Sequence, residues 1–235
     1  MSVPEIETAV ILAGGEGLRL RPLTNDIPKA MITVAGKPLL QWVIEGLRKH
    51  GVQKIVVGVA YKKEKVIDYF GNGKDFGVKI DYSNHTVEGG TSEGFRLAIE
   101  RHVSDDIFVA MNGDELVTLD LPDFVKCHCS SGGLATVAIG PLRSPYGVVE
   151  LEGNDIVGFQ EKPILRSHFV SIGTYIFSHE VLDYLPDTGD IERTAFPRLV
   201  SMRKLKAYTH AGFWATVNTM KDLQDVEDQL RGREA

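Results

Sequence analysis

Residues 8–24 read Thr-Ala-Val-Ile-Leu-Ala-Gly-Gly-Glu-Gly-Leu-Arg-Leu-Arg-Pro-Leu-Thr, and this stretch decides the fold class. It begins with an uninterrupted apolar run, Thr8–Ala13, as expected for a strand buried on both faces of a sheet. The glycines that follow let backbone N–H groups approach a ligand closely, and consecutive N–H groups form an anion-binding concavity. The stretch therefore predicts the first strand of an α/β sheet, followed by a phosphate-binding loop.

The rest of the first half alternates helix and strand patterns, which predicts βαβ units and a mostly parallel sheet. Helical spacing occupies 39–47, 62–70 and 92–102, and apolar strand runs occupy 54–60, 78–82 and 106–111. The second half is less regular and predicts a mixed sheet. Its strand patterns lie at 135–139, 147–150, 156–160, 169–177 and 206–208, with helices near 181–185, 191–202 and 220–231. No linker separates the halves, so we expect one domain, residues 1–235, with lobes of about 1–115 and 116–235.

Composition excludes several classes of protein. The net charge of −6 argues against a nucleic-acid partner, which needs a basic surface. No apolar run approaches the ~18–20 residues of a membrane span, and Met1–Glu5 lacks the features of a signal peptide. The two cysteines, Cys127 and Cys129, cannot form a long-range disulfide, so we expect a cytoplasmic protein. Their spacing is too tight for a metal knuckle and predicts a helix with buried thiols.

The glycine loop differs from two common phosphate loops. No GxxxxGK[ST] string occurs, and a GxGxxG dinucleotide fingerprint would need glycine where Leu20 stands. A nicotinamide-dependent dehydrogenase is therefore disfavoured. Arg19 adds a planar, permanently charged fork beside the loop, and Lys29 adds a compact point charge. These residues predict a site for a triphosphate.

Residues 12–24, with Pro28-Lys29-Ala30 and Gly36-Lys37-Pro38, resemble the signature of the sugar-1-phosphate nucleotidyltransferases, or NDP-sugar pyrophosphorylases. Further stretches match this family in order: 57–61, 69–71, 90–91, 112–114, 146–149, 161–163, 173–175 and 212–214. The resemblance implies the nucleotide-diphospho-sugar transferase (GT-A-like) fold, with a Rossmann-like, mostly parallel mixed sheet flanked by helices. It implies the short form without a C-terminal β-helix domain. It also implies Mg²⁺-dependent, in-line transfer of a nucleotidyl group from an NTP to a sugar 1-phosphate, with release of pyrophosphate.

The resemblance also assigns roles to particular residues. Arg19 matches the residue for the β- and γ-phosphates, Lys29 that for the α-phosphate, Asp114 the Mg²⁺ ligand and Lys162 the residue for the sugar phosphate. The nucleotide would contact Leu12, Ala13, Gly14, Gly15, Gly17, Arg19, His85, Gly90 and Thr91. The sugar phosphate would contact Tyr146, Gly147, Glu161, Lys162, Gly173 and Thr174. The base (guanine, cytosine, uracil or thymine) and the sugar stay open, and His85 is as compatible with a plain loop as with a base-reading role.

Three positions depart from the family pattern. Leu18 replaces a hydroxyl residue, and Glu93 places a carboxylate after Gly90-Thr91, where it would repel a triphosphate unless it turns away. A second metal-ligating Asp is missing near the C-terminus, where Thr216 or Asn218 stands. We take Asn218 as the second Mg²⁺ ligand, because its carbonyl oxygen can bind the ion without adding charge.

Two alternative functions follow from these departures. One is a catalytically silent sugar-nucleotide-binding subunit of the same fold. The other is a cytidylyltransferase acting on a non-sugar phosphate, although Glu161-Lys162-Pro163 and Tyr146-Gly147 point to a sugar. Short members of the family are often dimers, so a homodimer is among the expected states.

Overall fold

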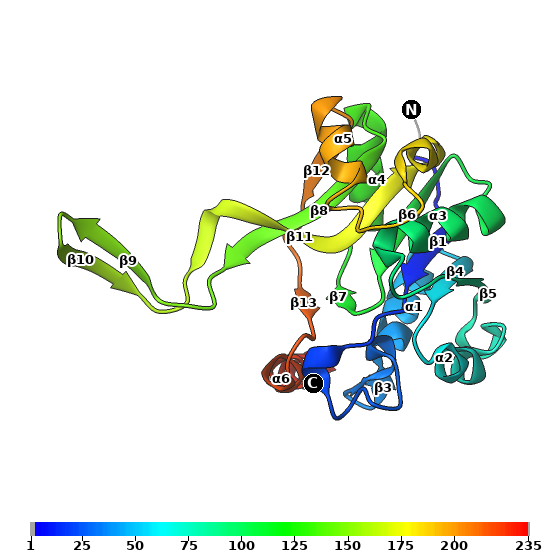
Figure 1. The fold of residues 1–235 in the computed structure, drawn as a ribbon, viewed down its shortest axis with the longest axis horizontal. Helices are drawn as coiled ribbons and strands as arrows, with labels where there is room; N and C mark the ends of the chain where they lie inside the picture. Colours follow the sequence, from blue (N-terminus) through cyan, green and yellow to red (C-terminus); the bar gives the residue numbers. More distant parts are fainter. Residues whose placement is uncertain (1–2, 235) are drawn as a thin grey trace.

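The computed structural model describes residues 3–234, and its centre is a seven-stranded sheet in the order β12-β8-β11-β6-β1-β4-β5 (Figure 1). The predicted domain, residues 1–235, is thus described without residues 1, 2 and 235. The first-half runs form parallel neighbours: β1 (Thr8–Leu12) lies between β4 (Lys54–Val59) and β6 (Ile107–Asn112), and β5 (Lys79–Asn84) pairs with β4. The predicted parallel half is confirmed.

The second half adds the mixed part of the sheet. The long strand β11 (Ile164–Ser178) runs antiparallel to β6 and to β8 (Ala135–Arg143), and β12 (Leu205–Thr209) pairs parallel with β8. The predicted fold class, a mostly parallel mixed sheet flanked by helices, is therefore confirmed.

Helices cover both faces because the buried strands place apolar side chains alternately on each side. In β1, for example, Ala9 and Ile11 belong to one apolar core and Val10 to the other. The first core is closed by α1 (Leu39–Lys49), α2 (Lys63–Phe70), α4 (Leu121–Ser131) and α6 (Met220–Glu234). The second is closed by α3 (Gly90–His102), η4 (His179–Tyr184) and α5 (Ala195–Ser201).

Two helix predictions need correction. The segment near 181–185 is a 3-10 helix, η4, and the helix expected at 191–202 is shortened to α5 because residues 191–194 form a turn. The remaining 3-10 turns are η1 (Leu18–Leu20), η2 (Lys29–Met31) and η3 (Lys74–Phe76).

The cysteine helix is confirmed as α4, but the expectation of buried thiols is wrong. Cys127 is half-buried and Cys129 is exposed, whereas His128 between them faces the sheet and is only 3% exposed. Helical geometry explains this, since three consecutive residues point in three directions and only one can face the core.

Three short strand pairs lie outside the main sheet. They are β2 (Thr33–Val34) with β3 (Lys37–Pro38), β7 (Glu115–Val117) with β13 (Trp214–Thr216), and β9 (Val148–Glu152) with β10 (Asp155–Gln160). The pairing of β7 with β13 matters for the site, because it returns the C-terminal part of the chain to the end of β6.

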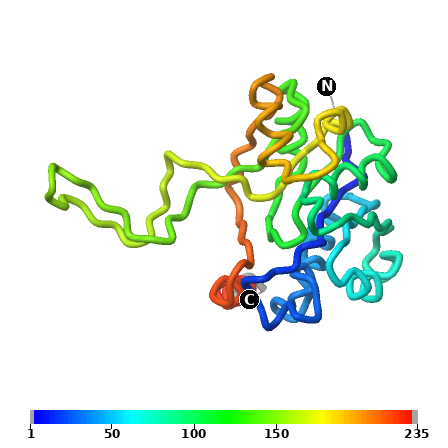
Figure 2. The backbone as a smooth tube through the Cα atoms, in the orientation of Figure 1, coloured from blue at the N-terminus to red at the C-terminus, as the bar shows by residue number. Residues whose placement is uncertain are grey.

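The hairpin of β9 and β10 projects away from the body on an extension of β8 and β11 (Figures 1 and 2). A hydrogen bond from Ser144 N to Pro163 O, 3.0 Å, closes its base. We call residues 144–163 the arm. No helix among residues 3–234 is long and apolar enough to cross a membrane.

Candidate active site

The glycine loop lies where β1 ends, between two flanking strands. Gly113 N donates to Leu12 O at 2.8 Å and Ala13 N donates to Gly58 O at 2.7 Å, so the start of the loop is fixed on both sides. Within residues 3–234, the N–H groups of Gly14, Gly15, Glu16 and Gly17 have no hydrogen-bond acceptor. Successive free N–H groups are the donors that an anion-binding concavity requires, so the loop keeps the donors on which that prediction depends.

Two of these glycines are required by their surroundings. A Cβ on Gly14 would lie 2.7 Å from the His85 ring and 2.8 Å from the Ala60 Cβ. Gly17 has φ +64°, in the left-handed region that favours glycine. Gly15, by contrast, has open space where its Cβ would be. The loop therefore takes its shape from close packing at Gly14 and from backbone conformation at Gly17.

A cavity of about 280 Å³ opens beside this loop. It is lined by the residues predicted to contact the nucleotide except Gly17 and Arg19, and by the predicted catalytic residues Lys29 and Asp114. Asp190 also lines it and was not predicted from the sequence. The lining residues are Leu12, Ala13, Gly14, Gly15, Lys29, Ala30, His85, Val87, Gly90, Thr91, Asn112, Asp114 and Asp190. Asp190 lies at the cavity because the next residue, Ile191, donates its N–H to Thr91 Oγ1 at 2.9 Å. This hydrogen bond joins the 189–192 turn to the start of α3, which is distant in the sequence.

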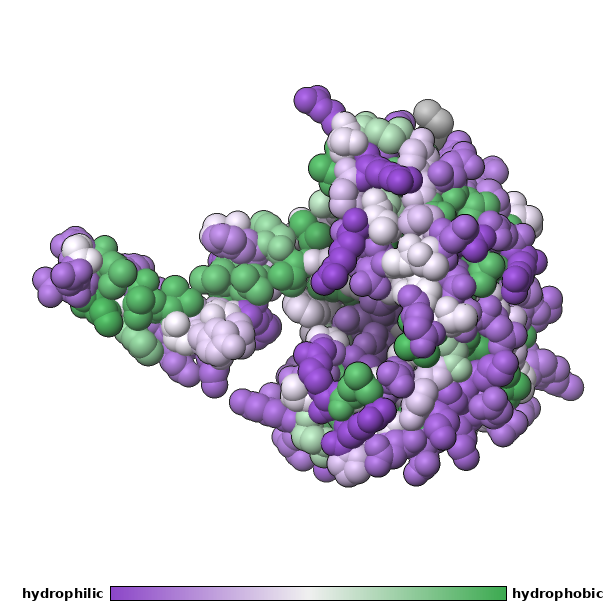
Figure 3. All heavy atoms as spheres, in the orientation of Figure 1, coloured by the Kyte–Doolittle hydropathy of each residue, from purple (hydrophilic) through white to green (hydrophobic). Residues whose placement is uncertain are grey.

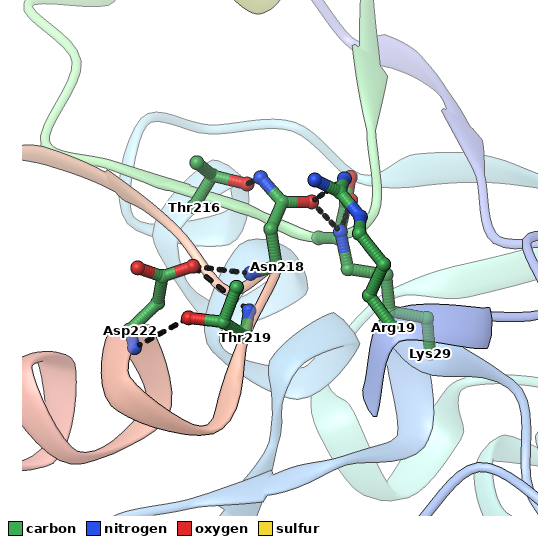
Figure 4. Close-up of polar contacts among 7 residues, drawn as sticks. Arg19, Lys29, Thr216, Asn218, Thr219 and Asp222 are labelled. Carbon is green, nitrogen blue, oxygen red and sulfur yellow. Dashed lines mark hydrogen bonds and ion pairs between the residues drawn. The ribbon is translucent and has the colours of Figure 1, made fainter. Parts of the chain in front are cut away.

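Charged and amide side chains converge at the rim of the cavity (Figure 4). The Lys29 ammonium forms an ion pair with the Asp114 carboxylate and donates to Asn218 Oδ1 at 2.7 Å. Arg19 Nη2 donates to the same Asn218 oxygen at 3.1 Å. Three of the four predicted catalytic residues, Arg19, Lys29 and Asp114, are thus joined in one network with Asn218.

A capping box at the start of α6 holds Asn218 in place (Figure 4). The Asp222 carboxylate accepts hydrogen bonds from Asn218 N at 3.0 Å and Thr219 N at 2.8 Å, while Asp222 N donates to Thr219 Oγ1 at 3.2 Å. This reciprocal pattern is the Thr-x-x-Asp version of the N-terminal capping motif. The Thr219-to-Asp222 spacing is the sequence signal that could have identified Asp222 as a positioning residue.

Glu115 lies directly behind Asp114. Burial first, and the charge of Asp114 second, raise the pKa of Glu115 to about 8, against the opposing effects of the Lys29 charge and a hydrogen bond with Thr216. At neutral pH this carboxyl is therefore mostly protonated. Glu115 is therefore a neighbour of the charged network, and Asp114 is the carboxylate of that network.

The oxygen atoms around Lys29 suit a hard cation. Asp114 and Asn218 both direct oxygens at one point, which the Lys29 ammonium occupies. One carboxylate and one amide oxygen match the way proteins hold Mg²⁺, which keeps several waters and binds substrate phosphates. Among residues 3–231, whose side chains the structure describes, no group of three His, Cys, Asp or Glu could hold a metal ion by itself. The residues present fit an ion shared with a phosphate ligand.

The structure places two of the residues that depart from the family pattern. Glu93 turns toward its own loop, where Thr86 N and Thr86 Oγ1 each donate to it at 2.7 Å, and these bonds lower the pKa of its carboxyl. Leu18, which stands in place of a hydroxyl residue, has an exposed side chain. His85 lines the cavity, donates from Nδ1 to Thr86 O at 3.0 Å, and buries Nε2 against Gly14 with no partner among the described residues.

The residues predicted for the sugar phosphate are divided between two places. Gly173 adjoins the cavity, because its Cβ would lie 2.9 Å from Asn112 Nδ2, and Thr174 is fully buried behind it. Tyr146, Gly147, Glu161 and Lys162 lie on the arm, away from the Asp114 network (Figure 1). The structure brings the nucleotide residues together and leaves these four apart.

The fold and the cavity are those of a nucleotide-binding α/β protein. A family model described as nucleotidyl transferase matches residues 8–232, and the chain therefore belongs to the nucleotidyl transferase family. The resemblance to the sugar-1-phosphate nucleotidyltransferases is confirmed at the level of the family.

Known relatives are of the same kind. A UTP–glucose-1-phosphate uridylyltransferase of Synechocystis is 40% identical over 212 residues, covering 82% of this chain and 55% of the relative. The catalytic subunit beta of a mannose-1-phosphate guanylyltransferase of Dictyostelium discoideum is 34% identical over 221 residues, covering 91% of this chain and 62% of the relative. The crystal structure of HddC from Yersinia pseudotuberculosis superposes with a TM-score of 0.76 at 25% identity, covering 96% and 100% of the two chains. The chain spans 55% and 62% of the lengths of the two enzymes.

Proposed function

We propose that this protein transfers a nucleotidyl group from an NTP to a sugar 1-phosphate, giving an NDP-sugar and pyrophosphate. One observation carries the proposal: the four free N–H groups of residues 14–17 open beside the network of Arg19, Lys29 and Asp114. Free amides and fixed cations suit a triphosphate. The names of the relatives do not favour a silent subunit or a non-sugar phosphate.

The chemistry requires positioning and charge stabilisation more than proton transfer. An oxygen of the sugar phosphate attacks the α-phosphorus in line, its new P–O bond forms, and the bond to pyrophosphate breaks. Arg19 would stabilise the charge that grows on pyrophosphate, and Lys29 the charge on the α-phosphate. A phosphate monoester is largely dianionic near pH 7 and is already a nucleophile, so no general base is needed.

Mg²⁺ is the proposed cofactor. Asp114 and the Asn218 carbonyl would hold it, and the bound ion would neutralise phosphate charge during transfer. Lys29 has to give up its place between these two oxygens and turn to the phosphates. The ion pair of Lys29 with Asp114 keeps both groups charged and close to their working positions before substrate binds.

The sugar side of the site stays a prediction. We assign Tyr146, Gly147, Glu161, Lys162, Gly173 and Thr174 to the sugar phosphate, in the lobe of about 116–235, and His85 to the neighbourhood of the base, in the lobe of about 1–115. We also propose that the protein acts in the cytoplasm, without nucleic-acid or membrane partners, and that a homodimer is its assembled state.

Pyrophosphate release tests the proposed function. Common nucleoside triphosphates are crossed with sugar 1-phosphates in the presence of Mg²⁺, beginning with UTP and glucose 1-phosphate and with GTP and mannose 1-phosphate. We expect release with at least one pair. Asp114→Asn should lower that rate by about 10²–10³-fold, as for loss of one preorganised charge. Asp68→Asn, a change of an exposed residue on α2, is the matched control. Nucleotide binding without release from any pair would reject the proposal.

A further inference from the structure

A turn far along the chain brings a second carboxylate, that of Asp190, to the cavity. The residues on both sides of it are fixed to the start of α3. Gly189 N donates to Gly89 O at 2.9 Å, and Ile191 N donates to Thr91 Oγ1 at 2.9 Å. The backbone of Asp190 is therefore held in one place at the cavity wall.

The side chain of Asp190 is free, although its backbone is fixed. Among residues 3–231, whose side chains the structure describes, none donates a hydrogen bond to its carboxylate or forms an ion pair with it. Glu192 on the same turn, by contrast, accepts from Tyr175 Oη and Thr91 Oγ1, each at 3.4 Å. Exposed charge is ordinary on this protein, whose body has a mainly hydrophilic surface (Figure 3). Asp190 differs because it is fixed and lines a cavity.

Gly90 leaves the space that this carboxylate occupies. A Cβ on Gly90 would lie 3.0 Å from Asp190 Oδ1 and 2.6 Å from Gly189 O. Gly90 itself lines the cavity, so the contact locates a carboxylate oxygen at the wall formed by the start of α3. The missing side chain at this position lets the two segments meet closely.

The walls of the cavity carry opposite charges. The free N–H groups of residues 14–17 and the Lys29 ammonium attract phosphate, whereas the Asp190 carboxylate repels it. A nucleotide should therefore bind with its phosphates at the glycine loop and its nucleoside toward Asp190. A carboxylate can only accept hydrogen bonds, and the uncharged nucleoside supplies hydroxyl and N–H donors.

We propose that the Asp190 carboxylate binds the 2′- and 3′-hydroxyls of a ribose, so that the protein selects ribonucleotides over 2′-deoxyribonucleotides. Two vicinal hydroxyls match the two oxygens of one carboxylate, and an acidic side chain binds ribose in the dinucleotide-binding α/β folds. Among the bases only guanine presents two adjacent donors, whereas every ribonucleotide presents the diol. The inference rests on the proposed function, because it concerns the same cavity. It narrows the substrate to ribonucleoside triphosphates and disfavours dTTP.

A cycle of ligand and residue changes tests this contact. Dissociation constants of UTP and dUTP, and of GTP and dGTP, are measured by calorimetry with Mg²⁺ and without sugar phosphate. We expect the wild type to bind the ribonucleotide of at least one pair about 10–100-fold more tightly, the range for hydrogen bonds to a charged group. Asp190→Ala should bind both forms equally. The variant also loses repulsion of the phosphates, but that change affects both forms and cancels in their ratio.

Two further variants complete the cycle. Asp183→Asn, a change of an exposed residue on η4, is the matched control and should keep the wild-type ratio. Asp190→Asn keeps an acceptor oxygen at the same place and should retain part of the ratio. The thermal midpoint shows whether each variant folds.

Three outcomes would overturn the inference. One is equal binding of the ribo and deoxy forms by the wild type. Another is a ratio that Asp190→Ala leaves unchanged. The third is equal weakening of both forms by Asp190→Ala, which would assign the carboxylate to the base. The proposed function fails on a different result, the absence of pyrophosphate release with every substrate pair, so the two failures are distinguished.

Discussion

At the scale of single residues, Asn218 has more contacts in the charged network than its neutral side chain suggests. Its Oδ1 accepts hydrogen bonds from Lys29 and from Arg19, and its Nδ2 donates to Thr216 Oγ1 at 3.0 Å. A neutral acceptor between two cations orients them without cancelling their charge. Lys29 is held in addition by its ion pair with Asp114, whereas Arg19 has no carboxylate partner among the described residues.

Replacement of Asn218 tests this orienting role. We expect Asn218→Ala to lower kcat by about 10²-fold, because small displacements of positioned groups have effects of that size. Asn218→Asp keeps an oxygen at the same place and should retain more activity than Asn218→Ala. Steady-state pyrophosphate release at saturating Mg²⁺ is the measurement. Equal activity of Asn218→Ala and the wild type would contradict the assignment.

The two adjacent glycines of the loop should respond differently to alanine. Gly14→Ala creates contacts under 3 Å with His85 and Ala60, so we expect a loss of about 1–3 kcal/mol of unfolding free energy. Gly15→Ala meets no atom within 4 Å and should leave stability unchanged. Its methyl group would enter the cavity, so it should weaken nucleotide binding. Urea unfolding and nucleotide titration of both variants separate the two effects. Equal stabilities of the two variants would contradict the packing explanation.

At the scale of elements, the start of α6 connects helix capping to the active site. The capping box of Thr219 and Asp222 satisfies free N–H groups of the helix and at the same time holds the backbone of Asn218. The β7–β13 pair fixes the approach of this segment, with Thr216 opposite Glu115. A local stability element therefore sets the position of a residue in the charged network.

Asp222→Ala should reduce both stability and activity. Loss of a capping interaction costs about 1 kcal/mol, and Asn218 loses the bond that holds its N–H. Asp225→Ala, a change of an exposed residue on the same helix, is the control and should affect neither. Chemical unfolding gives the free energy and pyrophosphate release gives the rate. An Asp222→Ala variant with normal activity would show that Asn218 is held by other contacts.

The packing of α4 on the sheet predicts a pH dependence of stability. Burial lowers the pKa of His128 to about 4, from 6.5, while its nitrogens contact Thr136 Oγ1 at 2.8 Å and Ser178 Oγ at 3.1 Å. Between these pH values the unfolded chain binds a proton that the folded chain does not. Stability should therefore decrease as the pH falls from 6.5 toward 4, by up to about 1.4 kcal/mol per pH unit from this residue.

His128→Gln tests the assignment, because it removes the titrating group and keeps polar atoms near both hydroxyls. The unfolding free energy is compared with that of the wild type across this pH range. We expect the variant to show a shallower slope, while His50→Gln, a change of an exposed residue, keeps the wild-type slope. Parallel curves for His128→Gln and the wild type would exclude His128 as the source.

At the scale of the whole molecule, the cavity lies where the chain direction divides. From β1 the chain passes through α1, which packs on one face of the sheet, while α3 leads into β6 across the other face. The loops after β1 and β6 therefore separate at their carboxyl ends and leave a crevice. The glycine loop and Asp114 occupy its two sides.

A ligand that bridges this crevice should stabilise the entire fold. A triphosphate present at about 100 times its dissociation constant should add about 2.7 kcal/mol to the unfolding free energy. Arg19→Ala should reduce this gain, because it removes a phosphate-facing charge outside the apolar cores. Thermal unfolding with and without nucleotide is the measurement. No stabilisation by any nucleoside triphosphate would contradict the assigned cavity.

The sequence by itself determined the elements whose pattern is local. Apolar runs such as Thr8–Ala13 and Lys54–Ala60 identify buried strands because each has to be apolar on both faces. The loop glycines, with Arg19 and Lys29, predict a phosphate site, because few other residues combine close approach with fixed charge, and the structure places Arg19 and Lys29 in one network beside the loop. Asp114 followed from its place after a predicted strand. These predictions depend on neighbours in the chain, so the sequence was sufficient for them.

Only the tertiary structure decided the contacts between distant segments. Asn218 contacts Lys29 because β7 pairs with β13, and Asp190 lies at the cavity because Ile191 bonds to Thr91. No local sequence pattern predicts either of these long-range contacts. The turn of Glu93 toward Thr86 depends on the shape of one loop. The extended arm is the clearest case. Its two strands could be predicted from the sequence, but the direction in which the arm projects from the body could not (Figure 1).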